Sequence, residues 1–315
     1  MELMEVIRRA LHYGRTMSKG ASLARIFVIY LVALGVASAW LAWGPDTRWL
    51  WLDGLIADLL ATAVVFVASR IHHNSSCYDP YWSVLPPFLV AAWWISADST
   101  GVDRTRAILV AVVVGFWALR LTANWVQDWP GMGHEDWRYP MLRDNAGRLE
   151  AVVDLMAIHV VPTLIVFLAL VPAYAVVALP GRSINALDWV ALLIGLAAPI
   201  LQYVADAQMR RFIRTRQPGQ AMDRGLWSWS RHPNYFGEIS FWVALALFGI
   251  AGSPGDWWWL GLGAVAMIAM FQGASIPMME ERSLKRRPAY QDVIDRVPRL
   301  IPRPPRRSSA QESVV

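Results

Sequence analysis

The stretch RHPNYFGEISFWVALALFGIAG, residues 231–252, opens with polar and charged side chains and continues as an apolar run. Its apolar part, residues 235–252, approaches the roughly 20 residues that a helix needs to cross a bilayer. A helix in hydrocarbon satisfies its own backbone hydrogen bonds. The run therefore predicts a membrane-spanning helix, with the polar side chains at the boundary between membrane and water.

The composition of the whole chain also indicates a membrane environment. The 315 residues are 56% hydrophobic and include 18 Trp, and the mean hydropathy is +0.35. Charged residues make up 17%, below the roughly 25% typical of soluble domains. Similar apolar runs recur and predict an all-α, polytopic transmembrane helix bundle of about eight spans. The spans are expected at residues 25–43, 50–70, 84–98, 104–123, 152–179, 187–205, 235–252 and 257–276.

The positive charges predict the orientation of the chain. Of the 29 Lys and Arg residues, the loops on one side hold only Arg48, Arg104, Arg106 and Arg182. Because positive residues favour the cytoplasmic side, both termini are expected there, in a multi-pass integral membrane protein. The short span at residues 84–98 is needed, since without it the later basic loops would change sides. The net charge of +5 then indicates topology and membrane-lipid partners, with no nucleic-acid partner.

The domain organisation follows from the absence of long polar linkers between the spans. One membrane domain is expected over residues 25–302, preceded by an amphipathic segment, residues 1–24, on the membrane surface. Residues 303–315 are basic and Ser-rich, and are expected to be disordered. The single Cys77 excludes an intrachain disulfide and a Cys-rich metal site. His134 has acidic residues directly beside it, but adjacent side chains diverge, and no metal site is expected.

Polar side chains inside expected spans are candidates for function. Glu238 lies near the start of a spanning helix, where a carboxylate costs about 2.5–3.5 kcal/mol, so such residues usually face the bundle interior; the alternative is snorkelling at the interface. Asn234 shares its helical face. Gln202 and Asp206 form a second pair with the same spacing, or a snorkelling helix end. All four are expected at the cytoplasmic face. His159 is expected to be buried and hydrogen-bonded to a neighbouring helix.

A second candidate precedes the third expected span. Asp79 stands between Tyr78 and Tyr81, in YDPYW. A carboxylic acid in an aromatic, poorly hydrated environment has a raised pKa and can donate a proton or a hydrogen bond to a carbonyl oxygen. The alternative is that Asp79 only caps the turn at Pro80.

Three stretches resemble motifs of a known family: YDPYWSV (78–84), GHEDWRYPMLRD (133–144) and RHPNYFGE (231–238). The chain resembles the domain-of-unknown-function family 1295 (DUF1295), within the steroid 5-alpha-reductase superfamily. That superfamily also includes sterol reductases and isoprenylcysteine carboxyl methyltransferases. The reductase-like portion covers about residues 74–302.

The resemblance implies a membrane-embedded cavity that holds NADPH and opens to the cytoplasm. It implies catalytic roles for Asp79 or Tyr78, on the substrate carbonyl, and for Glu238, near the nicotinamide. One departure is that the catalytic Tyr of the steroid reductases would fall near Trp117, and Tyr78 or Tyr81 would then replace it. The cofactor-binding residues that the resemblance implies are Gln202, Asp206, Arg216, Arg231, His232, Asn234, Tyr235 and Glu238.

The expected function is therefore an NADPH-dependent reductase, similar to 3-oxo-5-alpha-steroid 4-dehydrogenases. Its substrate would be a lipid-soluble, steroid-like or isoprenoid carbonyl compound with a conjugated C=C bond. Two alternatives remain. One is an S-adenosylmethionine-dependent methyltransferase acting on a lipid or prenyl group, since that branch also carries RHP-x-Y-x-G. The other is a non-enzymatic lipid-binding or transport protein. Asn234 together with Glu238 resembles the reductase branch.

Overall fold

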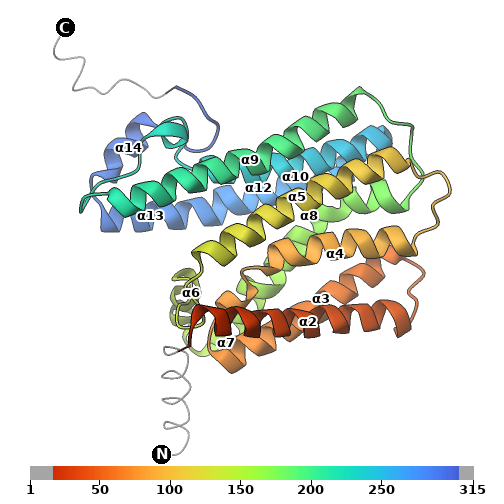
Figure 1. The fold of residues 1–315 in the computed structure, drawn as a ribbon, viewed down its shortest axis with the longest axis horizontal. Coiled ribbons are helices and arrows are strands. Elements are labelled where there is room, and N and C mark those ends of the chain that lie inside the picture. The colour runs from red at the N-terminus through yellow and green to blue at the C-terminus, as the bar shows by residue number, and fades with distance from the viewer. Residues whose placement is uncertain (1–16, 305–315) are drawn as a thin grey trace, which may run out of the picture. The chain divides into compact units, whose positions relative to one another are not determined.

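The computed structural model describes residues 17–304, which are helical and contain no strand (Figure 1). Most of the expected N-terminal segment and nearly all of the expected basic tail lie outside the described residues. The chain divides into two compact units, residues 1–181 and residues 182–315. Each is described by itself.

The first unit is a bundle of long helices (Figure 1). It contains α2 (Lys19–Trp43), α3 (Leu50–His72), α4 (Tyr81–Ser96), α5 (Arg104–Asp128) and α8 (Val161–Ala178). Side-chain caps start two of them: Ser18 accepts a hydrogen bond from the Ala21 amide, and Asp103 accepts one from the Arg106 amide. α2 packs along α3, and α4 contacts α3, α5 and α8. α4 thus lies at the centre of this unit.

Short helices connect α5 to α8. They are α6 (Arg138–Ala146), a 3₁₀ turn (Gly147–Leu149), α7 (Glu150–Val153) and a π-helical stretch (Asp154–Val160). A further 3₁₀ turn, Ser75–Tyr78, precedes α4. π-helical turns are rare and occur often at functional sites, which draws attention to the side chains of this region.

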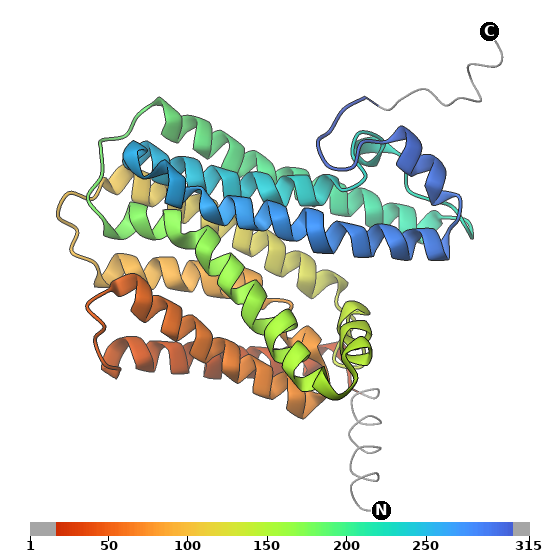
Figure 2. The same cartoon turned by 180° about the vertical axis from the view of Figure 1, so that it is seen from behind.

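The second unit is built around two long, paired helices, α9 (Ala186–Thr215) and α10 (Pro233–Gly252). Its other helices are α11 (Trp257–Leu260), α12 (Leu262–Met270), α13 (Ile276–Arg286) and α14 (Tyr290–Arg296), with 3₁₀ turns at Gly225–Ser228 and Pro254–Asp256. α12 packs on α10. A π-helical stretch, Phe271–Ser275, joins α12 to α13 in one long helix, drawn in blue in Figure 2.

Seven helical stretches of the described chain are long and apolar enough to cross a membrane. They are Lys19–Trp43, Leu50–His72, Arg104–Asp128, Arg138–Ala178, Ala186–Thr215, Pro233–Gly252 and Pro254–Arg286. The chain is therefore an integral, multi-pass membrane protein, as its composition predicts, and its exposed apolar side chains, such as Phe27 and Leu193, contact membrane lipids.

The expected third span differs from the others. It is present as α4, but α4 has 16 residues with Pro86 and Pro87 inside it. At 1.5 Å per residue it is about 24 Å long, shorter than the roughly 30 Å of a hydrocarbon core. The placement of both termini on the cytoplasmic side stays a prediction.

Candidate functional site

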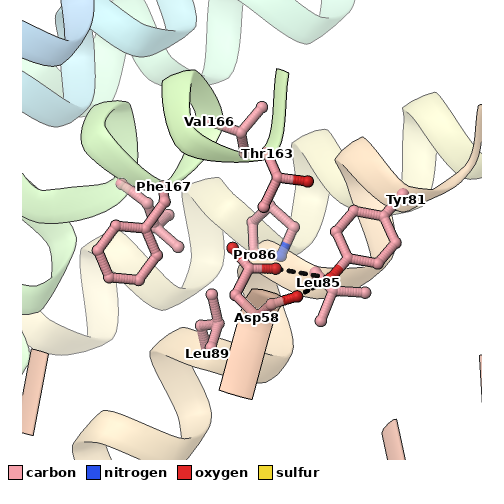
Figure 3. Close-up of a pocket in the computed structure, with 9 residues that line it drawn as sticks. Asp58, Tyr81, Leu85, Pro86, Leu89, Thr163, Val166 and Phe167 are labelled. Carbon is pink, nitrogen blue, oxygen red and sulfur yellow. Dashed lines mark hydrogen bonds between the residues drawn. The ribbon is translucent and has the colours of Figure 1, made fainter. Parts of the chain in front are cut away.

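Asp58, near the middle of α3, carries a carboxyl group buried in the first unit. It is 2% exposed. The Tyr81 hydroxyl, at the start of α4, lies 2.7 Å from its Oδ1 atom and 2.7 Å from its main-chain oxygen (Figure 3). Within residues 17–304, no ion pair joins Asp58 to a cation. A buried carboxyl in a spanning helix, paired only with a phenol, is a candidate for function.

A chain of hydroxyl groups extends from Asp58 across the unit. Thr62 Oγ1 lies 3.0 Å from the Tyr81 hydroxyl and 3.0 Å from Thr163 Oγ1 of α8. Thr163 Oγ1 lies 2.7 Å from the Tyr78 hydroxyl. All four hydroxyl-bearing residues are buried. The two tyrosine rings also stack, with centroids 5.0 Å apart. Tyr78, a predicted catalytic residue, is thus connected to Asp58 by hydrogen bonds.

A small cavity lies beside Asp58 and Tyr81 (Figure 3). Its volume is about 10 Å³, close to what one water molecule requires. The space has one polar end, and the rest of the lining is apolar. The apolar lining residues are Leu85, Pro86, Leu89, Val166, Phe167 and Leu170. A carbonyl oxygen has a suitable size and polarity for this polar end.

Asp79, the other predicted catalytic residue of this unit, has a different partner. The Tyr139 hydroxyl of α6 donates a hydrogen bond to its carboxyl group. Burial raises the pKa of Asp79 to about 6, although the bond from Tyr139 opposes the shift. Asp79 does not line the cavity beside Asp58. The structure therefore brings Tyr78, and not Asp79, into the Asp58 network.

The stretch GHEDWRYPMLRD is tied to the segment that precedes α4. The Asn74 side-chain amide donates to the carbonyl groups of Met132 and His134. Arg143 forms an ion pair of 2.6 Å with Glu135 and donates to Ser75 Oγ. Within residues 17–304, no three His, Cys, Asp or Glu side chains gather as a metal site would require. These contacts fix the loop that carries Tyr78, and the hydrogen bond from Tyr139 to Asp79 joins two of the family-like motifs directly.

His159 lies in the π-helical stretch and is fully buried. Its Nε2 atom lies 3.2 Å from Ser69 Oγ of α3, which confirms the predicted hydrogen bond to a neighbouring helix. Its Nδ1 atom lies 2.8 Å from the Asp154 carbonyl oxygen. The imidazole ring also packs on Tyr78, with centroids 4.9 Å apart. His159 therefore helps to fix the orientation of Tyr78.

In the second unit, Glu238 faces α9 from α10. The Gln202 side-chain amide donates to Glu238 Oε2 at 2.5 Å, and the Trp242 indole donates to Oε1 at 3.0 Å. Glu238 is 8% exposed, so it faces the interior as predicted and does not snorkel. The helices approach closely here because residue 237 is Gly: an added Cβ would lie 2.6 Å from Gln202 Cγ.

Asp206 and Asn234 form a second contact one turn along the same helix pair. The Asn234 side-chain amide lies 3.5 Å from Asp206 Oδ1. The four residues predicted from their spacing therefore do come together, as two amide–carboxylate pairs between α9 and α10. Such pairs offer donors and acceptors in the pattern that a carboxamide or a pair of ribose hydroxyls requires.

The remaining predicted cofactor residues lie in other surroundings. Arg231 donates to Glu280 at 2.7 Å and to the main-chain oxygens of Ile294 and Val297, both at 2.8 Å. It thereby anchors α14. His232 lies 3.2 Å from the same Glu280 carboxylate, and burial lowers its pKa.

Tyr235 and Arg216 complete the predicted set. The Tyr235 ring packs between His232 and Phe271, with centroid distances of 5.6 and 4.8 Å. Arg216 follows the end of α9 and lines an open pocket with Arg286 and Arg287.

Sequence reasoning missed Asp58. Its signal was nevertheless present: an acidic residue in the middle of an apolar run carries the same insertion cost that pointed to Glu238. The partner of Asp58 is Tyr81, 23 residues along the chain, and no local spacing joins the two. Tyr81 entered the sequence reasoning as a neighbour of Asp79 and, with Tyr78, as a replacement for the catalytic Tyr that is absent at Trp117.

Comparisons with known proteins found a family model and a relative that match this chain. A family model described as "Protein of unknown function (DUF1295)" matches residues 65–297. An uncharacterized protein of Schizosaccharomyces pombe is 26% identical over 272 residues, which covers 79% of each chain. No solved structure matches this chain.

Proposed function

This chain belongs to the DUF1295 family, and we propose that it is a membrane-embedded reductase that uses NADPH to reduce a C=C bond conjugated to a carbonyl group. The observation that carries this proposal is the Asp58–Tyr81 pair, buried inside a membrane-spanning unit and facing a small cavity with apolar walls. Reduction of an enone requires a hydrogen-bond donor to the carbonyl oxygen in apolar surroundings, and this pair supplies such a donor.

The chemistry assigns a task to each of these groups. NADPH would supply a hydride to the β-carbon of the substrate, and negative charge would then develop on the carbonyl oxygen. The Tyr81 hydroxyl would donate a hydrogen bond to that oxygen, and such a donor in a water-poor site stabilises the developing enolate. Asp58, at 2.7 Å, orients the phenol. Transfer of the Tyr81 proton to the enolate oxygen would give the enol, which tautomerises to the saturated carbonyl product.

The hydroxyl chain offers a route for protons. Thr62 and Thr163 connect Tyr81 to Tyr78 through contacts of 2.7 to 3.0 Å. A shift of each hydroxyl proton by one position would restore a proton lost from Tyr81 and leave the proton deficit on Tyr78, which would then take up a proton from water. Tyr78 then acts through its neighbours and does not touch the substrate.

The two amide–carboxylate pairs of the second unit support the cofactor assignment. Gln202 with Glu238, and Asp206 with Asn234, present amide and carboxylate groups side by side. A nicotinamide carboxamide both donates and accepts hydrogen bonds, so it fits such a pair. In this proposal these four residues bind NADPH, and Glu238 contacts its nicotinamide end.

The walls of the cavity favour a lipid-soluble substrate. Six apolar side chains of α4 and α8 surround its polar end, and the helices around it contact membrane lipids. A steroid-like or isoprenoid enone suits such walls. Because the present cavity holds about one water-sized group, a larger substrate requires α4 and α8 to part or their side chains to turn.

The test is NADPH consumption by the purified protein with a panel of lipid-soluble enones. We expect Asp58→Asn and Tyr81→Phe each to reduce kcat on the order of 100-fold, the usual effect of losing a positioned proton donor. Tyr30→Phe is the matched control. It removes a buried phenol that donates to the Cys77 carbonyl oxygen in the same unit and does not line the cavity. Equal activity in all three variants would contradict the proposal.

A further inference from the structure

An open pocket lies where two spanning stretches of the second unit end. α9 ends at Thr215, and the stretch that contains α13 ends at Arg286. The pocket volume is about 340 Å³, within the roughly 300–1,000 Å³ typical of small-molecule sites. Its lining residues are Arg216, Gln217, Pro218, Gly219, Gln220, Arg286 and Arg287.

The charge of this pocket is uncompensated. Three guanidinium groups line it, and none of its lining residues is acidic. Along residues 17–304, no ion pair joins any of the three arginines to a carboxylate. In the same unit, by contrast, Arg231 pairs with Glu280, and Arg296 pairs with Asp223 and Asp292. Burial and the nearby charges of Arg216 and Arg286 lower the pKa of Arg287. Like charges held together in this way favour a bound anion.

The position of the pocket at the ends of two spanning stretches indicates which anion it would bind. Both spanning stretches end here. With 30 and 33 residues, at 1.5 Å per residue they are longer than the roughly 30 Å hydrocarbon core, so the arginines lie on the water side of the hydrocarbon, within reach of lipid phosphates and of phosphates in solution. Arginine at a helix end often snorkels to this level. Snorkelling alone, however, does not gather side chains from two helix ends around one hollow. Guanidinium groups match the geometry of a phosphate and bind it through paired hydrogen bonds.

We propose that the pocket of Arg216, Arg286 and Arg287 is a phosphate-binding site. Two sources carry this chemistry: the headgroup of an anionic phospholipid, and a phosphate of the nucleotide cofactor. The nucleotide source rests on the proposed reductase function, whereas the lipid source stands without it. Gln217 and Gln220, which hydrogen-bond to each other across the loop, supply amide groups for the rest of either ligand.

The experiment measures thermal stabilisation of the full-length protein in a neutral detergent. The probes are dioctanoyl phosphatidylglycerol and adenosine 2′,5′-bisphosphate, with dioctanoyl phosphatidylcholine and adenosine as controls that lack the net charge or the phosphate. A ligand of the folded state raises Tm with its concentration, which yields an apparent Kd. The pocket variant is Arg216→Gln with Arg287→Gln. The matched control is Arg214→Gln, on the same helix end but outside the pocket lining.

We expect one anionic probe to stabilise the wild type. Each arginine near a phosphate contributes about fivefold in Kd, so the pocket variant should bind about 25-fold more weakly. Arg214→Gln should change Kd less than about twofold. The probe that follows this pattern identifies the source, lipid or nucleotide. Arg286→Gln, tested alone, provides a second variant, and each variant is compared at its own ligand-free Tm.

Two results would contradict the proposed phosphate-binding site. One is that neither anionic probe stabilises the wild type. The other is that the pocket variant and Arg214→Gln weaken binding equally, which would show diffuse attraction and no defined pocket. Neither result depends on turnover, so a failure of the site is distinguishable from a failure of the reductase proposal, which is tested by NADPH consumption.

Discussion

At the scale of single residues, two acidic groups of the first unit have different environments. Asp58 contacts Tyr81 inside the bundle, whereas Asp79 accepts a hydrogen bond from Tyr139 in the loop region before α4. In the sequence Asp79 stands between two tyrosines, whereas Asp58 lies in an aliphatic run, and only the fold gives Asp58 its tyrosine partner. Asp58 belongs to the proposed catalytic network, and Asp79 connects the segment before α4 to α6.

Asp79 gives a prediction on pH. Because its pKa is raised from 3.8 to about 6, the folded protein binds this proton more tightly than the unfolded chain does. The contribution of Asp79 to stability is therefore full below about pH 4 and is lost as the pH rises through about 6. Asp79→Asn keeps an oxygen that can accept from Tyr139 and removes the titration. The Tm of the variant relative to wild type should rise between pH 4 and pH 7, and a constant difference would contradict this.

Glu238 gives a second prediction at this scale. Its two carboxylate oxygens accept from Gln202 and Trp242. Glu238→Gln keeps the shape but turns one acceptor into a donor that faces the Gln202 amide. We expect the apparent Kd for NADPH to rise about tenfold or more, as for a lost hydrogen bond to a charged group. Unchanged NADPH affinity, measured by the same thermal shift, would remove Glu238 from the cofactor site.

At the scale of elements, the α9–α10 pair depends on Gly237. An added Cβ there would meet Gln202 Cγ at 2.6 Å and the Ala198 carbonyl oxygen at 3.0 Å. Gly237→Ala should therefore force the helices apart and lower the free energy of unfolding by about 1–3 kcal/mol. Gly115→Ala, in α5, is the control, because no atom lies within 4 Å of its added Cβ. The control should be neutral or stabilising by up to about 1 kcal/mol. An equal loss of unfolding free energy in both variants would contradict a close approach of α9 and α10 at Gly237.

The elements also show what the sequence could predict. Apolar runs predicted every long helix, because hydropathy is a local property, and the insertion cost of a carboxylate predicted the burial of Glu238. Partners distant in sequence could not be predicted: Arg231 pairs with Glu280, 49 residues away, and the four-residue spacing of Asn234 and Glu238 says nothing about it. The short length of α4 was foreseen, but its start was not: α4 begins at Tyr81, before the expected residue 84, and contains Pro86 and Pro87.

At the scale of the whole molecule, the seven spanning stretches establish a multi-pass membrane protein, and the sidedness of its loops remains a prediction from charge. We expect both termini in the cytoplasm. In bacterial cells, a fluorescent protein fused to the C-terminus should fluoresce, and alkaline phosphatase fused there should be inactive. A phosphatase fused in the loop after α8, near Arg182, is the matched control and should be active. The reverse pattern would contradict the predicted orientation.

The measurement that tests the central claim most directly is thermal stabilisation of the purified wild type by NADPH, NADH and S-adenosylmethionine in parallel. A ligand that binds only the folded protein raises Tm with its concentration, by RT ln(1 + [L]/Kd) in free energy. The reductase proposal predicts stabilisation by NADPH that is weakened in Glu238→Gln. Stabilisation by S-adenosylmethionine alone would contradict it in favour of a methyltransferase, and no stabilisation by any of the three would favour a lipid-binding or transport protein.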